Sequence, residues 1–119
     1  MSKKALENRA DLEFLLGKFY ERVRADQLIG PVFDQVAKVD WPSHELKIYN
    51  FWDSLLFGAE NYDGRPFPPH IPLNLRVEHF QRWLELFFFT VDESFEGYKA
   101  GEIEYRAYII GRNCMGKLD

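Results

Sequence analysis

The chain has 119 residues, of which 46% are hydrophobic, and its net charge is −4. This length predicts one domain over residues 1–119, and the composition excludes a disordered chain. The charge argues against nucleic acid as a partner, and no apolar run approaches the roughly 20 residues that cross a bilayer. We expect no membrane association. Because the lone Cys114 fits a reducing compartment and no signal peptide is visible, we also expect a cytoplasmic location.

The first predicted helix runs from about Asp11 to Arg24. Its apolar residues recur at steps of three and four, which is typical of an amphipathic helix: Leu12, Leu16, Phe19, Tyr20 and Val23. The Gly-Pro pair at 30–31 interrupts the helical pattern. Residues 32–33 are expected in a short helical turn.

The second predicted helix begins between Asp40 and Ser43, either of which can cap it, and ends at Gly58. Its core-facing residues lie at offsets 0, 4, 7, 8 and 11, which share one face: His44, Ile48, Phe51, Trp52 and Leu55. The stretch from Gly58 to Pro72 is rich in glycine and proline, so it is expected to be an ordered loop.

Two further helices are predicted in the second half of the chain. One runs from about Arg76 to Thr90, with apolar residues at helical spacing: Phe80, Trp83, Leu84, Phe87 and Phe88. The other covers about Tyr98 to Met115, with one stripe formed by Ile103, Ala107, Ile110 and Cys114. No segment alternates like a strand of useful length. The sequence therefore predicts an all-α protein with four main helices.

Aromatic residues are unusually frequent, at 17% of the chain. A small domain gains buried area from such residues, because each buries roughly 150–250 Å². The alternative is that the rings wall a flat cofactor. Composition alone favours the first interpretation.

His70 is the most constrained histidine in the sequence, because it lies in the run Pro-Pro-His-Ile-Pro at 68–72. A loop of this length in a compact domain is usually functional. Taken alone, a single histidine is more often a structural or surface residue. Other metal sites find no support, since the sequence lacks HExxH, CxxCH and Glu-x-x-His patterns and has one cysteine.

Three polar side chains fall on helix faces that otherwise carry core residues: Tyr20, His44 and Trp83. Each is ordinary by itself. Together they would place hydrogen-bond donors within an apolar interior, where such groups need partners. A bound diatomic ligand would supply one.

Several ordered motifs resemble the third group of the truncated haemoglobins. They are Phe-Tyr at 19–20, Gly-Pro-Val-Phe at 30–33, Asp-Gly-Arg-Pro-Phe-Pro-Pro-His at 63–70, and His-Phe-Gln-Arg-Trp-Leu-Glu-Leu-Phe at 79–87. His44, Ile48 and Phe51-Trp52 complete the match, which covers about residues 11–95. The resemblance implies a shortened globin fold, a 2-on-2 helical sandwich around one non-covalent haem b.

The resemblance also implies roles for individual residues. His70 would be the proximal ligand to the iron, and the distal residues would be Tyr20, His44 and Trp83. The haem would pack against Phe33, Ile48, Phe51 and Trp52. Its propionates have candidate partners on charge alone: Lys47, Arg65, Arg76 and His79.

This pocket predicts tight binding of O2 and other diatomic ligands, because donors stabilise a ligand that carries partial negative charge. Tight binding suits redox detoxification of NO with O2, or of peroxide, better than transport. Such activity would need an unidentified electron donor. Two alternatives stay open: a simple O2 storage or carrier globin, and a cofactor-free helical interaction or regulatory domain. Gas sensing is disfavoured because no output domain is attached.

Overall fold

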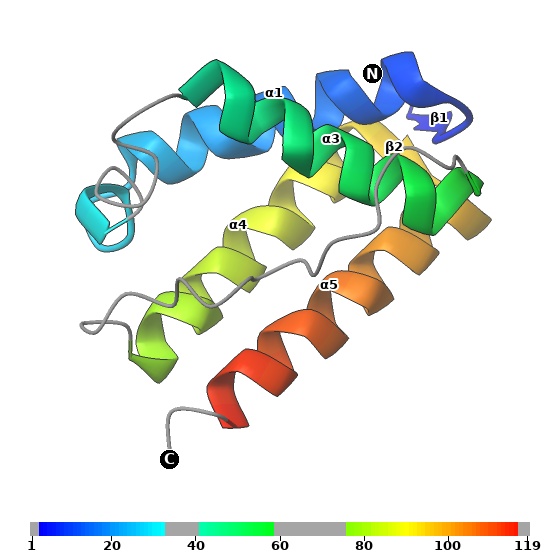
Figure 1. Ribbon diagram of the computed structural model, residues 1–119. Helices are drawn as coiled ribbons and strands as arrows, with labels where there is room; N and C mark the ends of the chain where they lie inside the picture. Colours follow the sequence, from blue (N-terminus) through cyan, green and yellow to red (C-terminus); the bar gives the residue numbers. More distant parts are fainter. Residues whose placement is uncertain (1–2, 33–40, 59–75, 117–119) are drawn as a thin grey trace.

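The structure is a computed structural model that describes residues 3–32, 41–58 and 76–116, without the side chains of residues 41, 44 and 114–116. Helices account for most of this part of the chain. They are α1 (Arg9–Ala25), α3 (Trp41–Phe57), α4 (Val77–Ser94) and α5 (Tyr98–Gly116). Two short strands, β1 (Lys4–Ala5) and β2 (Phe95–Glu96), accompany them. The prediction of an all-α protein with four main helices is confirmed (Figure 1).

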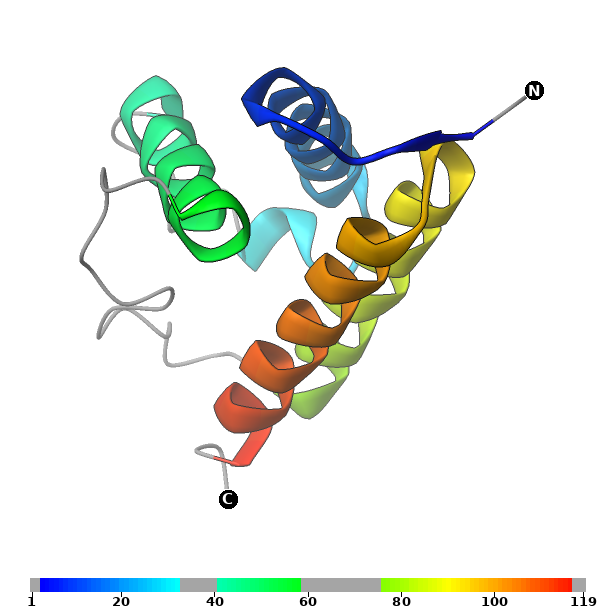
Figure 2. The ribbon, with the colours of Figure 1, turned by 90° about the vertical axis from the view of Figure 1, so that its right-hand side faces the viewer.

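The helices form two crossing layers, α1 with α3 over α4 with α5 (Figures 1 and 2). α4 and α5 run antiparallel, and α4 also packs on α1. The most deeply buried side chains come from the facing surfaces of these helices, as the periodic apolar pattern requires. They include Leu12, Leu16, Phe19, Val23, Phe87, Val91, Ile103 and Ala107. The core therefore lies between the two layers.

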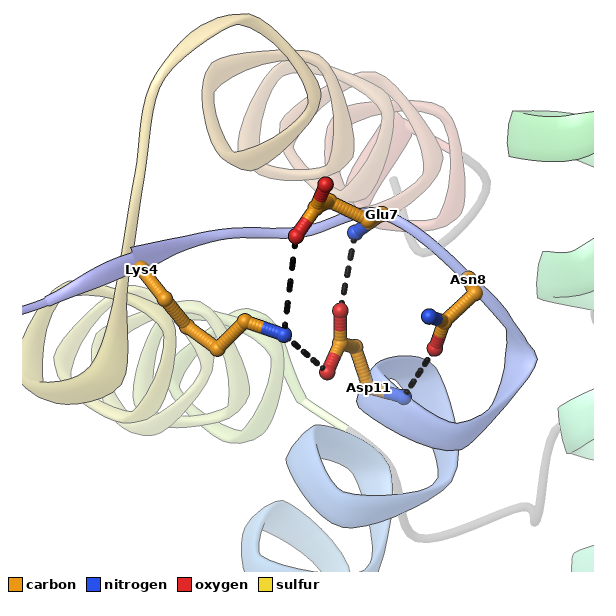
Figure 3. A network of polar contacts seen from close by, with 4 residues as sticks. All are labelled: Lys4, Glu7, Asn8 and Asp11. Atoms are coloured by element: carbon orange, nitrogen blue, oxygen red, sulfur yellow. Dashed lines mark hydrogen bonds and ion pairs between the residues drawn. The ribbon is translucent and has the colours of Figure 1, made fainter.

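The start of α1 is fixed by polar side chains. Asn8 is the N-cap, and its side-chain oxygen accepts a hydrogen bond from the Asp11 backbone N–H at 3.0 Å. The Asp11 carboxylate in turn accepts from Lys4 Nζ at 2.7 Å and from the Glu7 backbone N–H at 3.0 Å (Figure 3). This network explains why α1 begins two residues before the predicted start at Asp11.

β1 and β2 pair in parallel, with Lys4 opposite Phe95 and Ala5 opposite Glu96. The sequence does not predict them, because two residues are too few for an alternating pattern to be visible. The pair helps to set the end of α4, which continues to Ser94 instead of stopping near Thr90. Gly97 follows with φ at 95°, a left-handed conformation that favours glycine and turns the chain into α5.

The predicted interruption after the first helix occurs at Asp26. Its side chain accepts from the backbone N–H groups of Leu28 and Ile29, each at 3.0 Å. The chain packs tightly against the end of α1 at Gly30, where an added Cβ would lie 2.7 Å from the carbonyl oxygen of Arg24. Residues 30–32 are helical, so the Gly-Pro pair at 30–31, predicted to interrupt the helical pattern, begins the short turn that was predicted only for residues 32–33. The second half of that prediction, Phe33, lies outside the described residues.

Polar contacts between elements tie the helices together. Arg9 on α1 donates to Asp53 on α3 at 2.9 Å. Arg22 on α1 pairs with Glu93 on α4. Lys99 on α5 donates to the carbonyl oxygen of Leu56, at the end of α3, at 2.6 Å. Among the described helices, none is both long and apolar enough to cross a membrane.

Candidate functional site

Tyr20 and Trp83 lie together between the layers. α1 carries Tyr20 and α4 carries Trp83, and their residues are only 5% and 7% exposed. The ring of Phe19 contacts both, with centroids 4.7 Å from Tyr20 and 5.7 Å from Trp83. Two of the three predicted distal residues are thus brought into one apolar environment by the contact between α1 and α4.

The Tyr20 hydroxyl is held in its neutral form. Burial raises the pKa of Tyr20 well above its usual range, and Tyr49 contributes in the same direction, while a hydrogen bond with the Trp83 side chain opposes the shift. The indole of Trp83 can only donate, so the Tyr20 oxygen accepts this bond. That oxygen keeps its own O–H, and Tyr20 therefore remains a donor at any physiological pH.

α3 supplies further aromatic and apolar side chains to the site. Trp52 is buried and stacks on Phe87 of α4, with centroids 5.6 Å apart and an interplanar angle of 30°. Phe51 contacts Trp52 edge-on at 5.2 Å. Phe51 and Ile48 pack against the core and stay partly exposed. The backbone of His44 belongs to the same helix, and its side chain lies outside the described residues.

Phe87 is the centre of this aromatic group. It stacks on Trp83 at 5.5 Å and on Trp52 at 5.6 Å, and it meets Phe19 edge-on at 4.9 Å. All three neighbours come from different helices. One phenyl ring therefore sets the spacing between the helix that carries Trp83 and the two helices of the other layer.

The charged residues proposed as propionate partners lie at the ends of the helices or on their outer faces. Lys47 is exposed on α3, and Arg76 is exposed just before α4. The Arg76 backbone N–H donates to Nδ1 of His79 at 2.8 Å. A neutral His79 that accepts at Nδ1 carries its proton on Nε2, so it can still donate to a neighbouring carboxylate. Arg65 lies outside the described residues.

The predicted proximal ligand, His70, and the predicted packing residue, Phe33, also lie outside the described residues. Within the described part of the chain, no group of three or more His, Cys, Asp or Glu residues could hold a metal ion. A haem held by one histidine needs no such group.

Known proteins resemble this chain in both sequence and structure. The model of the bacterial-like globin family matches residues 5–106. The chain belongs to this family. This globin is 31% identical over 115 residues to the group 3 truncated haemoglobin ctb of Campylobacter jejuni, which covers 93% of this chain and 91% of that protein. It matches the crystal structure of a group III truncated haemoglobin from Campylobacter jejuni with a TM-score of 0.87 and 30% identity, over 99% of this chain and 96% of that one.

These matches confirm the resemblance to group III truncated haemoglobins and the globin fold that it implied. The family binds haem and small diatomic ligands. The described residues of this globin fit such a group in character, because partly exposed apolar side chains pack against the core that contains the buried Tyr20 phenol and Trp83 indole. These apolar side chains are Ile48, Phe51, Leu55, Leu86 and Phe88. Apolar side chains of this kind are suited to cover a flat, mostly apolar macrocycle. The Tyr20 phenol and the Trp83 indole are the polar groups that suit a small polar ligand beside it.

The side chains that position Tyr20 and Trp83 in the globin were not predicted from the sequence. Arg82, next to Trp83, donates to Asp26 at 2.8 Å and so ties α4 to the end of α1. Tyr49 lies between α3 and α1, where an added Cβ at Gly17 would be 3.4 Å from its hydroxyl. Burial and Glu45 raise the pKa of Tyr49 to about 12. Only Asp26 had a visible signal, as an acidic residue opening a turn.

Proposed function

We propose that this globin binds O2 and other diatomic ligands tightly and uses them in redox detoxification, of NO with O2 to give nitrate or of peroxide. The buried pair of Tyr20 and Trp83 is the observation that carries the proposal. We assign His44 as the third distal residue and His70 as the protein ligand to a non-covalent haem b. The haem would be enclosed by Phe33, Ile48, Phe51 and Trp52, with Lys47, Arg76 and His79 available to its carboxylates.

Haem supplies an iron centre that binds diatomic molecules and exchanges electrons with them. The chain supplies the hydrogen bonds. Trp83 donates to the Tyr20 oxygen, and the Tyr20 hydroxyl would in turn donate to a bound ligand that carries partial negative charge. Because burial keeps Tyr20 protonated, this donor does not titrate in the physiological range. His44 would act as a further donor or as a gate.

The strength of these bonds favours redox chemistry over transport. A hydrogen bond contributes roughly 0.5–1.5 kcal/mol, so one bond from Tyr20 and one from His44 would together slow ligand release by about 5- to 150-fold. A globin that releases oxygen this slowly is a poor carrier. Both proposed reactions consume electrons that the chain does not store, so they require an external donor such as a reductase. We place the globin in the cytoplasm, where such donors are found.

Replacement of Tyr20 by Phe tests the distal assignment. We expect the oxygen dissociation rate of the reduced protein to rise by about 2- to 13-fold, the effect of one hydrogen bond. Stopped-flow kinetics measures this rate directly. Tyr98→Phe is the matched control, because Tyr98 is 83% exposed on α5 whereas Tyr20 and Trp83 are buried in the core. An unchanged rate in Tyr20→Phe would contradict the proposed hydrogen bond.

His70→Ala tests the haem ligand separately. The purified wild type should be red with a strong Soret band, and the variant should show a weakened or shifted band because the iron has lost its protein ligand. A colourless wild type that does not take up added haemin would instead favour the cofactor-free interaction domain.

A further inference from the structure

The outer face of α5 carries a stripe of tyrosines. Tyr98, Gly101, Tyr105, Tyr108 and Arg112 follow one another at steps of 3, 4, 3 and 4, which places them on one side of a helix. All five are exposed, and the tyrosines expose 83%, 64% and 42% of their surfaces. α5 lies at an edge of the bundle beside α4 (Figures 1 and 2). We call these five residues the tyrosine stripe.

The opposite side of α5 already has its partners. Ala100, Ile103 and Ala107 are buried in the core, facing α4. The tyrosine stripe therefore lies on the side of the same helix that faces away from this core. Rows of large aromatic residues with an arginine are typical of the centre of protein interfaces, where acidic residues are depleted. The stripe contains no Asp or Glu.

We propose that the tyrosine stripe binds a second copy of this chain, with two α5 helices antiparallel about a twofold axis at Tyr105. The stripe is complementary to itself in this arrangement. Tyr98 and Arg112 lie seven residues on either side of Tyr105, so each Arg112 guanidinium meets the Tyr98 ring of the other copy. A guanidinium over an aromatic face is an attractive cation–π contact. The twofold symmetry repeats this contact, so the dimer contains two of them.

The small residue of the stripe fits the same register. Gly101 lies four residues before Tyr105 and Tyr108 three residues after it, so each Gly101 lies within one residue, about 1.5 Å along the helix, of the level of Tyr108 in the other copy. An added Cβ at Gly101 would meet nothing within 4 Å. The space above Gly101 can therefore receive a ring.

A parallel arrangement of the two α5 helices is less favourable. In it, Arg112 of one chain would face Arg112 of the other, and the two like charges would repel.

The available area predicts a weak dimer. The exposed parts of the three tyrosines amount to roughly 400 Å² per chain, about half of the ~800 Å² per partner that a typical stable interface buries. Side chains that flank the stripe, including Ile109, would add to this area. We therefore expect a dissociation constant in the micromolar range, about 1–100 µM.

Sedimentation equilibrium of the haem-loaded protein over about 5–500 µM tests the proposal. The wild type should change from monomer to dimer across this range. Tyr105→Glu places two carboxylates at the twofold axis and should weaken association by at least about 100-fold. Leu46→Glu is the matched control, because Leu46 is 53% exposed on α3 and away from the stripe. A wild type that stays monomeric throughout, or a Tyr105→Glu variant with an unchanged dissociation constant, overturns the proposal.

The register is tested by crosslinking with a short bismaleimide in a Cys114→Ser background. Tyr105→Cys should crosslink to itself, whereas Tyr98→Cys alone should not, and a mixture of Tyr98→Cys with Arg112→Cys should crosslink. Efficient self-crosslinking of Tyr98→Cys would contradict the antiparallel arrangement. Because these readouts do not involve the distal pocket, they are independent of the redox function proposed above.

Discussion

The helices of this globin are held together by two kinds of contact, an aromatic centre and charged edges. The centre is made of buried rings on three helices: Phe19, Trp52, Trp83 and Phe87. The edges are ion pairs at the periphery of the same helices, such as Arg9 with Asp53 and Asp26 with Arg82. Hydrogen bonds in the apolar centre act in a low dielectric, while water reaches the guanidinium side of the edge pairs, since the Arg9 and Arg82 side chains are 30% and 38% exposed. The Tyr20–Trp83 pair belongs to the centre, which is where a hydrogen bond to a small ligand is strongest.

Phe87→Ala should produce the largest loss of stability. It removes a fully buried ring that stacks on two tryptophans, so we expect unfolding to cost about 3–5 kcal/mol less than in the wild type. Urea unfolding followed by circular dichroism measures this loss. Phe89→Ala, two residues further along α4 and 60% exposed, should cost no more than about 1 kcal/mol, most of it the contact with Arg22. Equal losses would remove the distinction between centre and edge.

Arg9 allows a comparison within the charged edge, because it has one shielded and one exposed partner. It donates to Asp53 at 2.9 Å and to Glu13 at 2.7 Å, and these side chains are 12% and 47% exposed. We expect Asp53→Asn to lower the free energy of unfolding by about 1–2 kcal/mol, since it leaves a half-shielded guanidinium without its main counter-charge. Glu13→Gln should change it by less than about 0.5 kcal/mol. The same urea titration checks both, and a larger effect at Glu13 would show that shielding does not decide the strength of these pairs.

The smallest expected effect is a dependence on pH at the edge between α4 and α5. Burial, together with a hydrogen bond and charge repulsion from Asp92, raises the pKa of Glu104 to about 7, while Lys3 opposes the shift. A raised pKa means that the folded state favours the protonated acid. The contribution of protonated Glu104 to the free energy of unfolding is present below pH 4.5. It is lost as the pH rises from about 4.5 to 7.

Glu104→Gln should remove this loss, because the amide keeps a hydrogen-bond donor and does not titrate. At pH 8 we expect the variant to be more stable than the wild type by about 1 kcal/mol at most, after allowance for solvent screening. At pH 4 the two proteins should be nearly equal. Unfolding experiments between pH 4 and 8 test this, with Glu21→Gln on the exposed face of α1 as the control. A constant difference at all pH values would contradict the assignment to Glu104.

The aromatic centre was largely predictable from the sequence and the charged edges were not. Phe19, Trp83 and Phe87 occur at helical spacing within long periodic segments, and such periodicity specifies both a helix and its buried face. Asp53 and Arg82 lie on those same helices at positions without any distinguishing pattern. Their partners are 44 and 56 residues away in the chain, and such pairs become visible only when the helices are packed.

The candidate site divides in the same way. The identities of Tyr20, Trp83 and Trp52 as inward-facing residues followed from periodicity together with the family motifs. The sequence did not reveal that Trp83 hydrogen-bonds to Tyr20, because a hydrogen bond between α1 and α4 depends on the crossing of two helices. His70, Phe33 and the side chain of His44 lie outside the described residues, so their assignments stay predictions.

The short pairing of β1 with β2 has a consequence for the order of folding. Lys4 and Phe95 are partners, so 90 residues lie between the two halves of this contact. During synthesis the N-terminal segment must leave the ribosome and wait until almost the whole chain has followed before it can pair. Contacts of such long sequence separation form late and slow the final step of folding. We expect the N-terminal segment to be the last part of this globin to become protected against hydrogen exchange, after its helices have assembled.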